Sequence, residues 1–156
     1  MDEYMPMIDE KQLLHLIDDF VKTARNQYSA LEGVVGLLAA NFRHFTWTGI
    51  YLFDDGVLKL GPFRGAPSPH TTIETDKGIC AAAFRERQTI IVPDVNADPR
   101  FLACSLSTRS EIVVPIFDKE GAVVGEIDID SDQPDAFKDA DREILEKVAA
   151  RLGQLF

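Results

Sequence analysis

Two hairpins constrain the fold of this chain more than any other feature. An Asp-Asp-Gly turn at residues 54–56 joins residues 46–53 to residues 57–63, and a second turn joins residues 111–117 to residues 122–130. Aspartate followed by glycine is a strong local hairpin signal. The flanking runs are rich in β-branched and aromatic residues, which favour strands. Strands joined by such short turns run antiparallel, so the sequence predicts an antiparallel sheet.

Four stretches with helical character accompany these strands. The first follows Asp9, whose spacing from Gln12 is that of a capping box, and the others are expected near residues 29–41, 77–87 and 139–155. The order of elements lacks the strand–helix–strand alternation of parallel sheets. We therefore predict an α+β fold with a central antiparallel sheet flanked by helices. The first and last helices are expected to pack together on one sheet face.

Length and composition indicate a single folded unit. The chain has 156 residues, of which 46% are hydrophobic, and both values are ordinary for one globular domain. We expect a loose N-terminal tail over residues 1–8 and one domain over residues 9–156.

The net charge of −10 excludes several classes of partner. Such a chain lacks the clustered positive charge that nucleic acids or anionic membranes require. The acidic start and the lack of a long apolar run indicate a cytoplasmic protein without a secretory segment. The sequence holds no C-x-x-C or H-E-x-x-H motif, so we expect no metal ion. A cationic ligand would not be repelled.

The strand at residues 122–130 has one apolar and one acidic face. Strand alternation places Glu126, Asp128 and Asp130 on the same side. One interpretation is an ordinary solvated sheet face. The other is a site, because like charges at alternate positions repel one another unless they hold a cation or share a proton.

Each of the two cysteines has a plain and a chemical interpretation. Cys80 falls in the first turn of the helix expected at residues 77–87, where the helix N-terminus lowers a thiol pKa. It can equally be a small buried residue of an alanine-rich helix. Cys104 falls in an irregular polar loop at residues 100–110. It is either a half-buried inert thiol or a reactive one, since loops often carry function.

An ordered set of short motifs makes the chain resemble a known family. The motifs are Trp47-Thr48-Gly49-Ile50-Tyr51-Leu52, Leu60-Gly61-Pro62-Phe63-Arg64-Gly65, Gly78-Ile79-Cys80, Val92-Pro93-Asp94-Val95, Ala103-Cys104, Ser110-Glu111-Ile112-Val113-Val114-Pro115 and Asp128-Ile129-Asp130-Ser131. Together they resemble the free methionine-(R)-sulfoxide reductases, which are stand-alone GAF-domain enzymes. The interval of 24 residues between the cysteines fits that family. The resemblance runs from Trp47 to the C-terminus and implies a GAF fold.

The resemblance also implies a small closed pocket for a free amino acid. In it, Trp47 and Tyr51 form an aromatic wall, while Glu111, Asp128 and Asp130 engage the substrate. The carboxylates would enclose the α-ammonium group of free methionine-(R)-sulfoxide. This agrees with the interpretation of the acidic face as a site that holds a cation. Peptide-bound methionine sulfoxide lacks that ammonium group and would be rejected.

Many members of this family carry a third cysteine in the loop that corresponds to residues 66–70, and this chain has none there. It resembles the two-cysteine subset, for which the resemblance implies a disulfide between Cys80 and Cys104. The implied roles are Cys104 as nucleophile and Cys80 as resolving thiol, although a helix N-terminus leaves the reverse assignment open.

The implied chemistry needs no bound cofactor. Attack on the sulfoxide leaves a sulfenic acid, Glu111 or Asp128 supplies a proton, and an external thioredoxin-like dithiol restores both thiols. Such domains also form homodimers, so we keep a homodimer as possible. Two alternatives stay open: a non-catalytic GAF sensory or ligand-binding module, and a redox-sensing protein that binds no amino acid.

Overall fold

A computed structural model describes residues 8–101 and 107–156. Its main elements, in chain order, are α1 (Glu10–Thr23), α2 (Gln27–Asn41), β1 (Trp47–Asp54), β2 (Val57–Arg64), β3 (Thr72–Glu74), α3 (Gly78–Glu86), β4 (Ile90–Val92), β5 (Ser110–Phe117), β6 (Val123–Ser131) and α4 (Asp139–Leu152). The six strands form one sheet in the order β3-β2-β1-β6-β5-β4, and all neighbouring pairs are antiparallel. This confirms the predicted α+β class.

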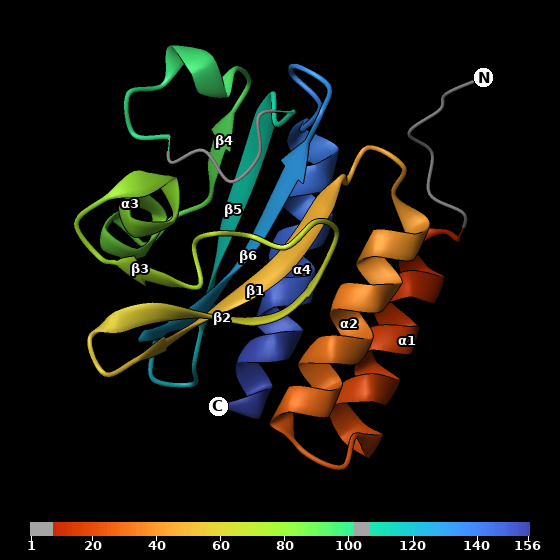
Figure 1. Ribbon diagram of the computed structural model, residues 1–156. Helices are drawn as coiled ribbons and strands as arrows, with labels where there is room; N and C mark the ends of the chain where they lie inside the picture. The colour runs from red at the N-terminus through yellow and green to blue at the C-terminus, as the bar shows by residue number, and fades with distance from the viewer. Residues whose placement is uncertain (1–7, 102–106) are drawn as a thin grey trace.

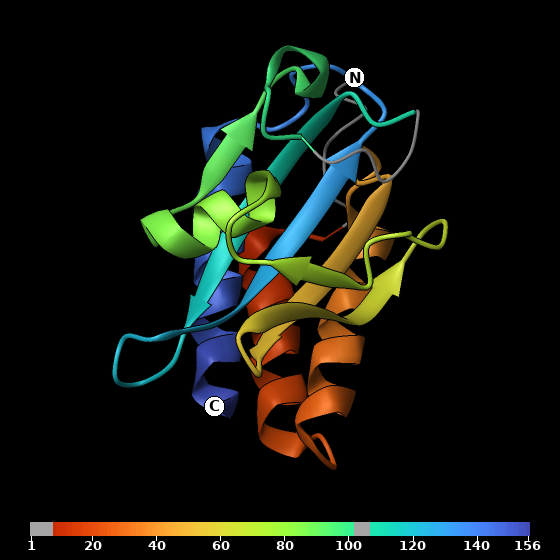
Figure 2. The same cartoon turned by 60° about the vertical axis from the view of Figure 1, so that its left-hand side comes forward.

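The sheet separates two layers of unequal size. Helices α1, α2 and α4 cover one face, where α4 packs on β5 and α2 on β1, as Figure 1 shows. The predicted contact between the first and last helices is present, because α1 packs against α4. On the other face lies α3, which contacts β5 and β6 (Figure 2). The predicted tail at residues 1–8 lies outside the described residues except for Ile8.

Local signals set several element boundaries as expected. The capping box of Asp9 and Gln12 begins α1. In the first hairpin, Asp55 and Gly56 both have positive φ, 53° and 79°, the backbone that a tight turn between twisted strands needs. Asn26 accepts a hydrogen bond from the Ser29 amide and caps the N-terminus of α2.

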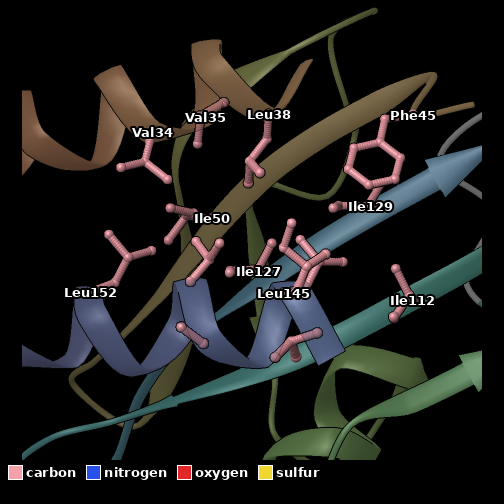
Figure 3. Close-up of a cluster of buried hydrophobic side chains, with 14 of the residues drawn as sticks. Val34, Val35, Leu38, Phe45, Ile50, Ile112, Ile127, Ile129, Leu145 and Leu152 are labelled. Atoms are coloured by element: carbon pink, nitrogen blue, oxygen red, sulfur yellow. The ribbon is translucent and has the colours of Figure 1, made fainter. Parts of the chain in front are cut away.

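The main core lies between the sheet and the three-helix layer. The apolar face of β6 supplies Ile127 and Ile129, and both side chains are fully buried against α2 and α4, beside Ile50 and Leu145 (Figure 3). Burying a side chain of this size contributes about 1.5–3 kcal/mol. The alternation of β6 therefore places its acidic face on the opposite side, toward α3.

Proline within a sheet is confined to edge strands and bulges, and β5 contains Pro115. β5 lies between β6 and β4, but β4 pairs only with Glu111–Val113. Pro115 lies beyond that pairing and faces Glu126 of β6, and a register shift follows between Ile116 and Phe117. The missing amide donor of Pro115 therefore falls where the sheet has no neighbour on the β4 side.

None of the helices in the described ranges is long and apolar enough to cross a membrane.

Candidate active site

Strand register brings the predicted carboxyl groups together. Glu111 on β5 pairs with Asp130 on β6, and Asp130 also pairs with Trp47 on β1. Asp128 pairs with Gly49 in the same ladder. Directly paired residues point to the same face of a sheet, so these three acids and Trp47 share the face that α3 covers.

The acidic face of β6 is not a solvated surface. Glu126 is 0% exposed, and Asp128 and Asp130 are each 2% exposed. One oxygen of Asp128, one of Asp130 and both of Glu126 are buried without a hydrogen-bond partner in the described part of the chain. A buried carboxylate without a partner is costly. The interpretation as an ordinary solvated face is therefore wrong.

Burial changes the protonation of this cluster. It raises the pKa of Asp128, and it raises the pKa of Glu126 and Asp130 well above the usual range of carboxyl groups. The negative charge of Asp128 adds to the effect on Glu126 and Asp130. A raised pKa favours the protonated form of a carboxyl group, and a cation bound beside it favours the charged form.

Cys80 lies in the first turn of α3 and carries a free thiol. It is 4% exposed, and burial, followed by the charges of Asp128 and Glu126, raises its pKa well above the usual thiol value. The lowered pKa that the helix N-terminus suggested is therefore wrong, because desolvation and neighbouring carboxyl groups outweigh the helix dipole. Its sulfur and one carboxylate oxygen each of Glu111 and Asp128 lie within 4.8 Å of one another.

The two predicted aromatic residues are close to each other and hold a loop. The ring centroids of Trp47 and Tyr51 are 6.5 Å apart. The Trp47 indole N–H donates to the carbonyl of Ala66 at 2.9 Å, and the Tyr51 hydroxyl donates to the carbonyl of His70 at 2.7 Å. Because these bonds span β1 and the segment before β3, the aromatic pair fixes residues 66–70 beside the acidic face.

Two glycines make room for the tryptophan. A Cβ on Gly49 would lie 2.3 Å from the Trp47 ring, and one on Gly65 would lie 2.8 Å from it. Gly65 also has φ +120°, which only glycine adopts without strain. The Trp47 ring stacks on the Phe63 ring, with the two ring centroids 5.8 Å apart. The position of the Trp47 ring therefore depends on glycine at residues 49 and 65, both of which belong to the family motifs.

Two hollows open on this face. The first is lined by His70, Ile73, Gly78, Ile79, Cys80, Glu111 and Asp128. The second is lined by Thr46, Trp47, Ala66, Ser68, Ser107, Thr108 and Asp130. Asp128 and Asp130 are two residues apart on one strand face, so the two hollows flank one acidic strip. Cys104, the predicted nucleophile, lies outside the described residues, between Phe101 and Ser107.

Sequence reasoning missed two members of this site. Glu126 belongs to the acidic face by alternation, but only its burial beside Cys80 and Asp128 marks it as part of the cluster. His70 lines the same hollow as Cys80. The signal that could have found it is its place in residues 66–70, the loop in which the resemblance implies a cysteine in many family members.

Comparisons with known proteins agree with this fold and site. The model of the GAF domain matches residues 12–156, and the chain therefore belongs to the GAF domain family. One relative, the free methionine-R-sulfoxide reductase of Saccharomyces cerevisiae, is 42% identical over 106 residues, which are 66% of this chain and 58% of that protein. The chain is thus a homologue of proteins that carry this name.

Solved structures show the same relationship over the full length. fRMsr of Staphylococcus aureus in its reduced form has a TM-score of 0.90 and 33% identity, covering 100% of both chains. The free methionine-R-sulfoxide reductase from Neisseria meningitidis, in complex with its substrate, has a TM-score of 0.88 and 31% identity, covering 98% of this chain and 93% of that one. These matches confirm the predicted GAF fold.

Proposed function

We propose that this protein reduces free L-methionine-(R)-sulfoxide to methionine. The observation that carries the proposal is the buried acidic face, on which Asp128 has an oxygen without a hydrogen-bond partner beside the free thiol of Cys80. A site of this kind selects a small ligand with a positive charge and presents a thiol to it. The homologues named for this activity have the same fold.

Substrate binding rests on charge compensation. The α-ammonium group of the amino acid donates to Glu111, Asp128 and Asp130, whose carboxyl groups lie on neighbouring positions of β5 and β6. Binding thereby supplies the partners that the buried oxygens of Asp128 and Asp130 lack. A peptide-bound methionine sulfoxide has an amide in place of the ammonium group and cannot make these ion pairs. The Trp47 and Tyr51 rings pack against the apolar part of the ligand.

The reaction transfers the sulfoxide oxygen to a cysteine. Cys104 attacks the sulfoxide sulfur as a thiolate, the oxygen is protonated, and methionine leaves with a sulfenic acid on Cys104. Asp128 is a candidate proton donor, because burial raises the pKa of its carboxyl group; in that role Asp128 is protonated, and Glu111 and Asp130 carry the charge that pairs with the ammonium group. Glu111 is a second candidate and lines the same hollow.

The second thiol then closes the cycle. Cys80 condenses with the sulfenic acid, forming the Cys80–Cys104 disulfide and releasing water. Burial raises the pKa of the Cys80 thiol, which supports its assignment as the later, resolving thiol, since it is protonated while the first step occurs. A thioredoxin-like dithiol returns both cysteines to thiols by exchange. This cycle involves no bound cofactor, suits the cytoplasm and runs in a monomer or a homodimer.

Single-turnover methionine release tests the proposal. Reduced protein is mixed with free L-methionine-(R)-sulfoxide without reductant, and released methionine is counted per chain for wild type, Cys104→Ser and Cys80→Ser. We expect about one equivalent from wild type and from Cys80→Ser, which stops at the sulfenic acid, and none from Cys104→Ser. If Cys80→Ser alone releases no methionine, Cys80 is the nucleophile and Cys104 is the resolving thiol. No release from wild type would overturn the reductase proposal.

A further inference from the structure

One cluster of this site has the composition of a transition-metal site. The sulfur of Cys80 and one oxygen each of Glu111 and Asp128 lie within 4.8 Å of one another, and all three residues are buried. The ligands come from three separate elements, α3, β5 and β6. Because they are far apart in sequence, no ligand spacing could reveal them. A thiolate with two carboxylates combines soft and hard donors, which suits Zn²⁺ and related divalent ions.

A second observation, the buried Oδ1 of Asp128, indicates a cationic ligand at this cluster. Asp128 is 2% exposed, it lines the hollow that Cys80 also lines, and its Oδ1 has no hydrogen-bond partner within the described ranges. A buried carboxylate oxygen of this kind normally pairs with a cation or a donor. His70 lines the same hollow.

We propose that Cys80, Glu111 and Asp128 form a binding site for a thiophilic divalent cation, with Zn²⁺ as its best match. Zn²⁺ binds cysteine sulfur at about 2.3 Å and carboxylate oxygen at about 2.0–2.2 Å. Tetrahedral coordination then brings ligand atoms to about 3.6 Å from one another. Rotamer changes of about 1 Å convert the present spacing into that geometry, and water fills the fourth position. The ion replaces the thiol proton of Cys80 and forms a sulfur–metal bond.

The metal site is independent of turnover, because metal binding needs neither substrate nor Cys104. If the proposed reductase function holds, an ion at this position occupies the place of the substrate ammonium group. The reductase and the metal site can therefore fail separately. Methionine release in the presence of a chelator reports on the first, and metal binding by the reduced, substrate-free protein reports on the second.

Cobalt spectroscopy and zinc dialysis test the site directly. Co²⁺ is titrated into reduced protein, and a thiolate-to-cobalt charge-transfer band reports ligation by sulfur. Equilibrium dialysis with Zn²⁺ gives the stoichiometry and affinity. We expect one ion per chain, loss of the band in Cys80→Ser, and Zn²⁺ affinity at least tenfold lower in Cys80→Ser and Asp128→Asn. Glu111→Gln provides a second carboxylate variant should Asp128→Asn fold poorly.

Matched variants separate this site from adventitious binding. Asp54→Asn removes the same charge as Asp128→Asn but from an exposed hairpin carboxylate, and it should leave the Zn²⁺ affinity unchanged. Cys104→Ser should keep the charge-transfer band. Loss of the band in Cys104→Ser would overturn the proposal, because the metal would then depend on the other thiol. Equal Zn²⁺ affinity in wild type, Cys80→Ser and Asp128→Asn would overturn it as well.

Discussion

Glu111 and Asp130 face each other across the β5–β6 ladder, so two acidic side chains lie side by side on a buried sheet face. Two carboxylates at this distance repel one another when both are charged, and an ammonium group bound between them compensates that charge. We predict that Asp130→Asn weakens binding of free methionine-(R)-sulfoxide at least tenfold without loss of folding stability. Calorimetry in the Cys104→Ser background, which prevents turnover, measures the affinity. The exposed-site variant Asp54→Asn should bind as tightly as its parent, and an unchanged affinity in Asp130→Asn would exclude this carboxylate from the ligand's charge partners.

The same carboxyl groups make ligand binding dependent on pH. Burial raises the pKa values of Asp128 and Asp130, so at acidic pH both are neutral and attract an ammonium group weakly. We predict that affinity for free methionine-(R)-sulfoxide rises from pH 5.5 to pH 7.5 and that binding releases protons. Calorimetry with a chelator, in two buffers of different ionisation enthalpy, counts those protons. Asp130→Asn should release fewer. An affinity that is flat or falls across this range would contradict the proposed charge partners.

Glu126 should make the folded protein less stable as the pH rises. Both of its oxygens are buried without a hydrogen-bond partner, and burial raises its pKa well above the usual value. Its proton therefore leaves the unfolded chain at about pH 4.3 but stays on the folded one. Stability is full below that pH and decreases above it, by at most about 1.4 kcal/mol per pH unit, until the folded pKa is reached.

A neutral substitution removes this penalty. We predict that Glu126→Gln is more stable than wild type at pH 8, by on the order of 1–3 kcal/mol, and that the difference shrinks toward pH 4.5. Urea unfolding of both proteins at the two pH values measures it. The negative charge of Asp128 raises the pKa of Glu126, and that of Glu126 raises the pKa of Cys80, so the difference reports Glu126 together with these neighbours. If the difference between the two proteins is the same at both pH values, Glu126 does not change its protonation on folding.

Gly49 should be needed for the position of Trp47. A Cβ at Gly49 would lie 2.3 Å from the Trp47 ring, which is confined by Phe63 and Gly65. We predict that Gly49→Ala lowers the free energy of unfolding by about 1–3 kcal/mol and changes the fluorescence of Trp47, the single tryptophan of the chain.

Gly36→Ala is the matched control for this substitution. Its new Cβ would meet only the flexible end of Arg64 at 3.3 Å, inside helix α2. Alanine is favoured over glycine in helices by about 1 kcal/mol. This variant should therefore be as stable as wild type or more stable. Equal effects of the two substitutions would mean that the Trp47 ring adapts freely.

Local features of the fold were predictable from the sequence, and long-range ones were not. The first hairpin and the capping box of Asp9 follow from neighbouring residues alone, and both are confirmed. The face of β6 followed from alternation, but alternation does not show what covers a face. The burial of Asp128 depends on α3 and on residues 66–70, which arrive from elsewhere in the chain.

The pKa of Cys80 could not be predicted from local sequence either. Its position in the first turn of α3 was predicted correctly, yet the local rule for helix N-termini gave the wrong direction for its pKa. The direction is set by burial and by carboxyl groups of β6, with Asp128 and Glu126 contributing most. Which carboxyl groups lie beside the Cys80 thiol depends on how segments that are distant in sequence pack together. The sequence alone does not give those distances.

We expect Tyr51 to hold residues 66–70 in position and not to take part in the chemical step. Its hydroxyl donates to the carbonyl of His70 at 2.7 Å, and its ring is fully buried. We predict that Tyr51→Phe keeps the ring packing and costs about 1 kcal/mol of stability. Residues 66–70 then lose the hydrogen bond from Tyr51 to His70, so the substrate KM should rise several-fold while kcat falls less. Steady-state kinetics with a dithiol reductant measures both constants. Tyr28→Phe, at an exposed tyrosine of α2, should change neither constant. A fall in kcat alone would instead place the Tyr51 hydroxyl in the chemical step.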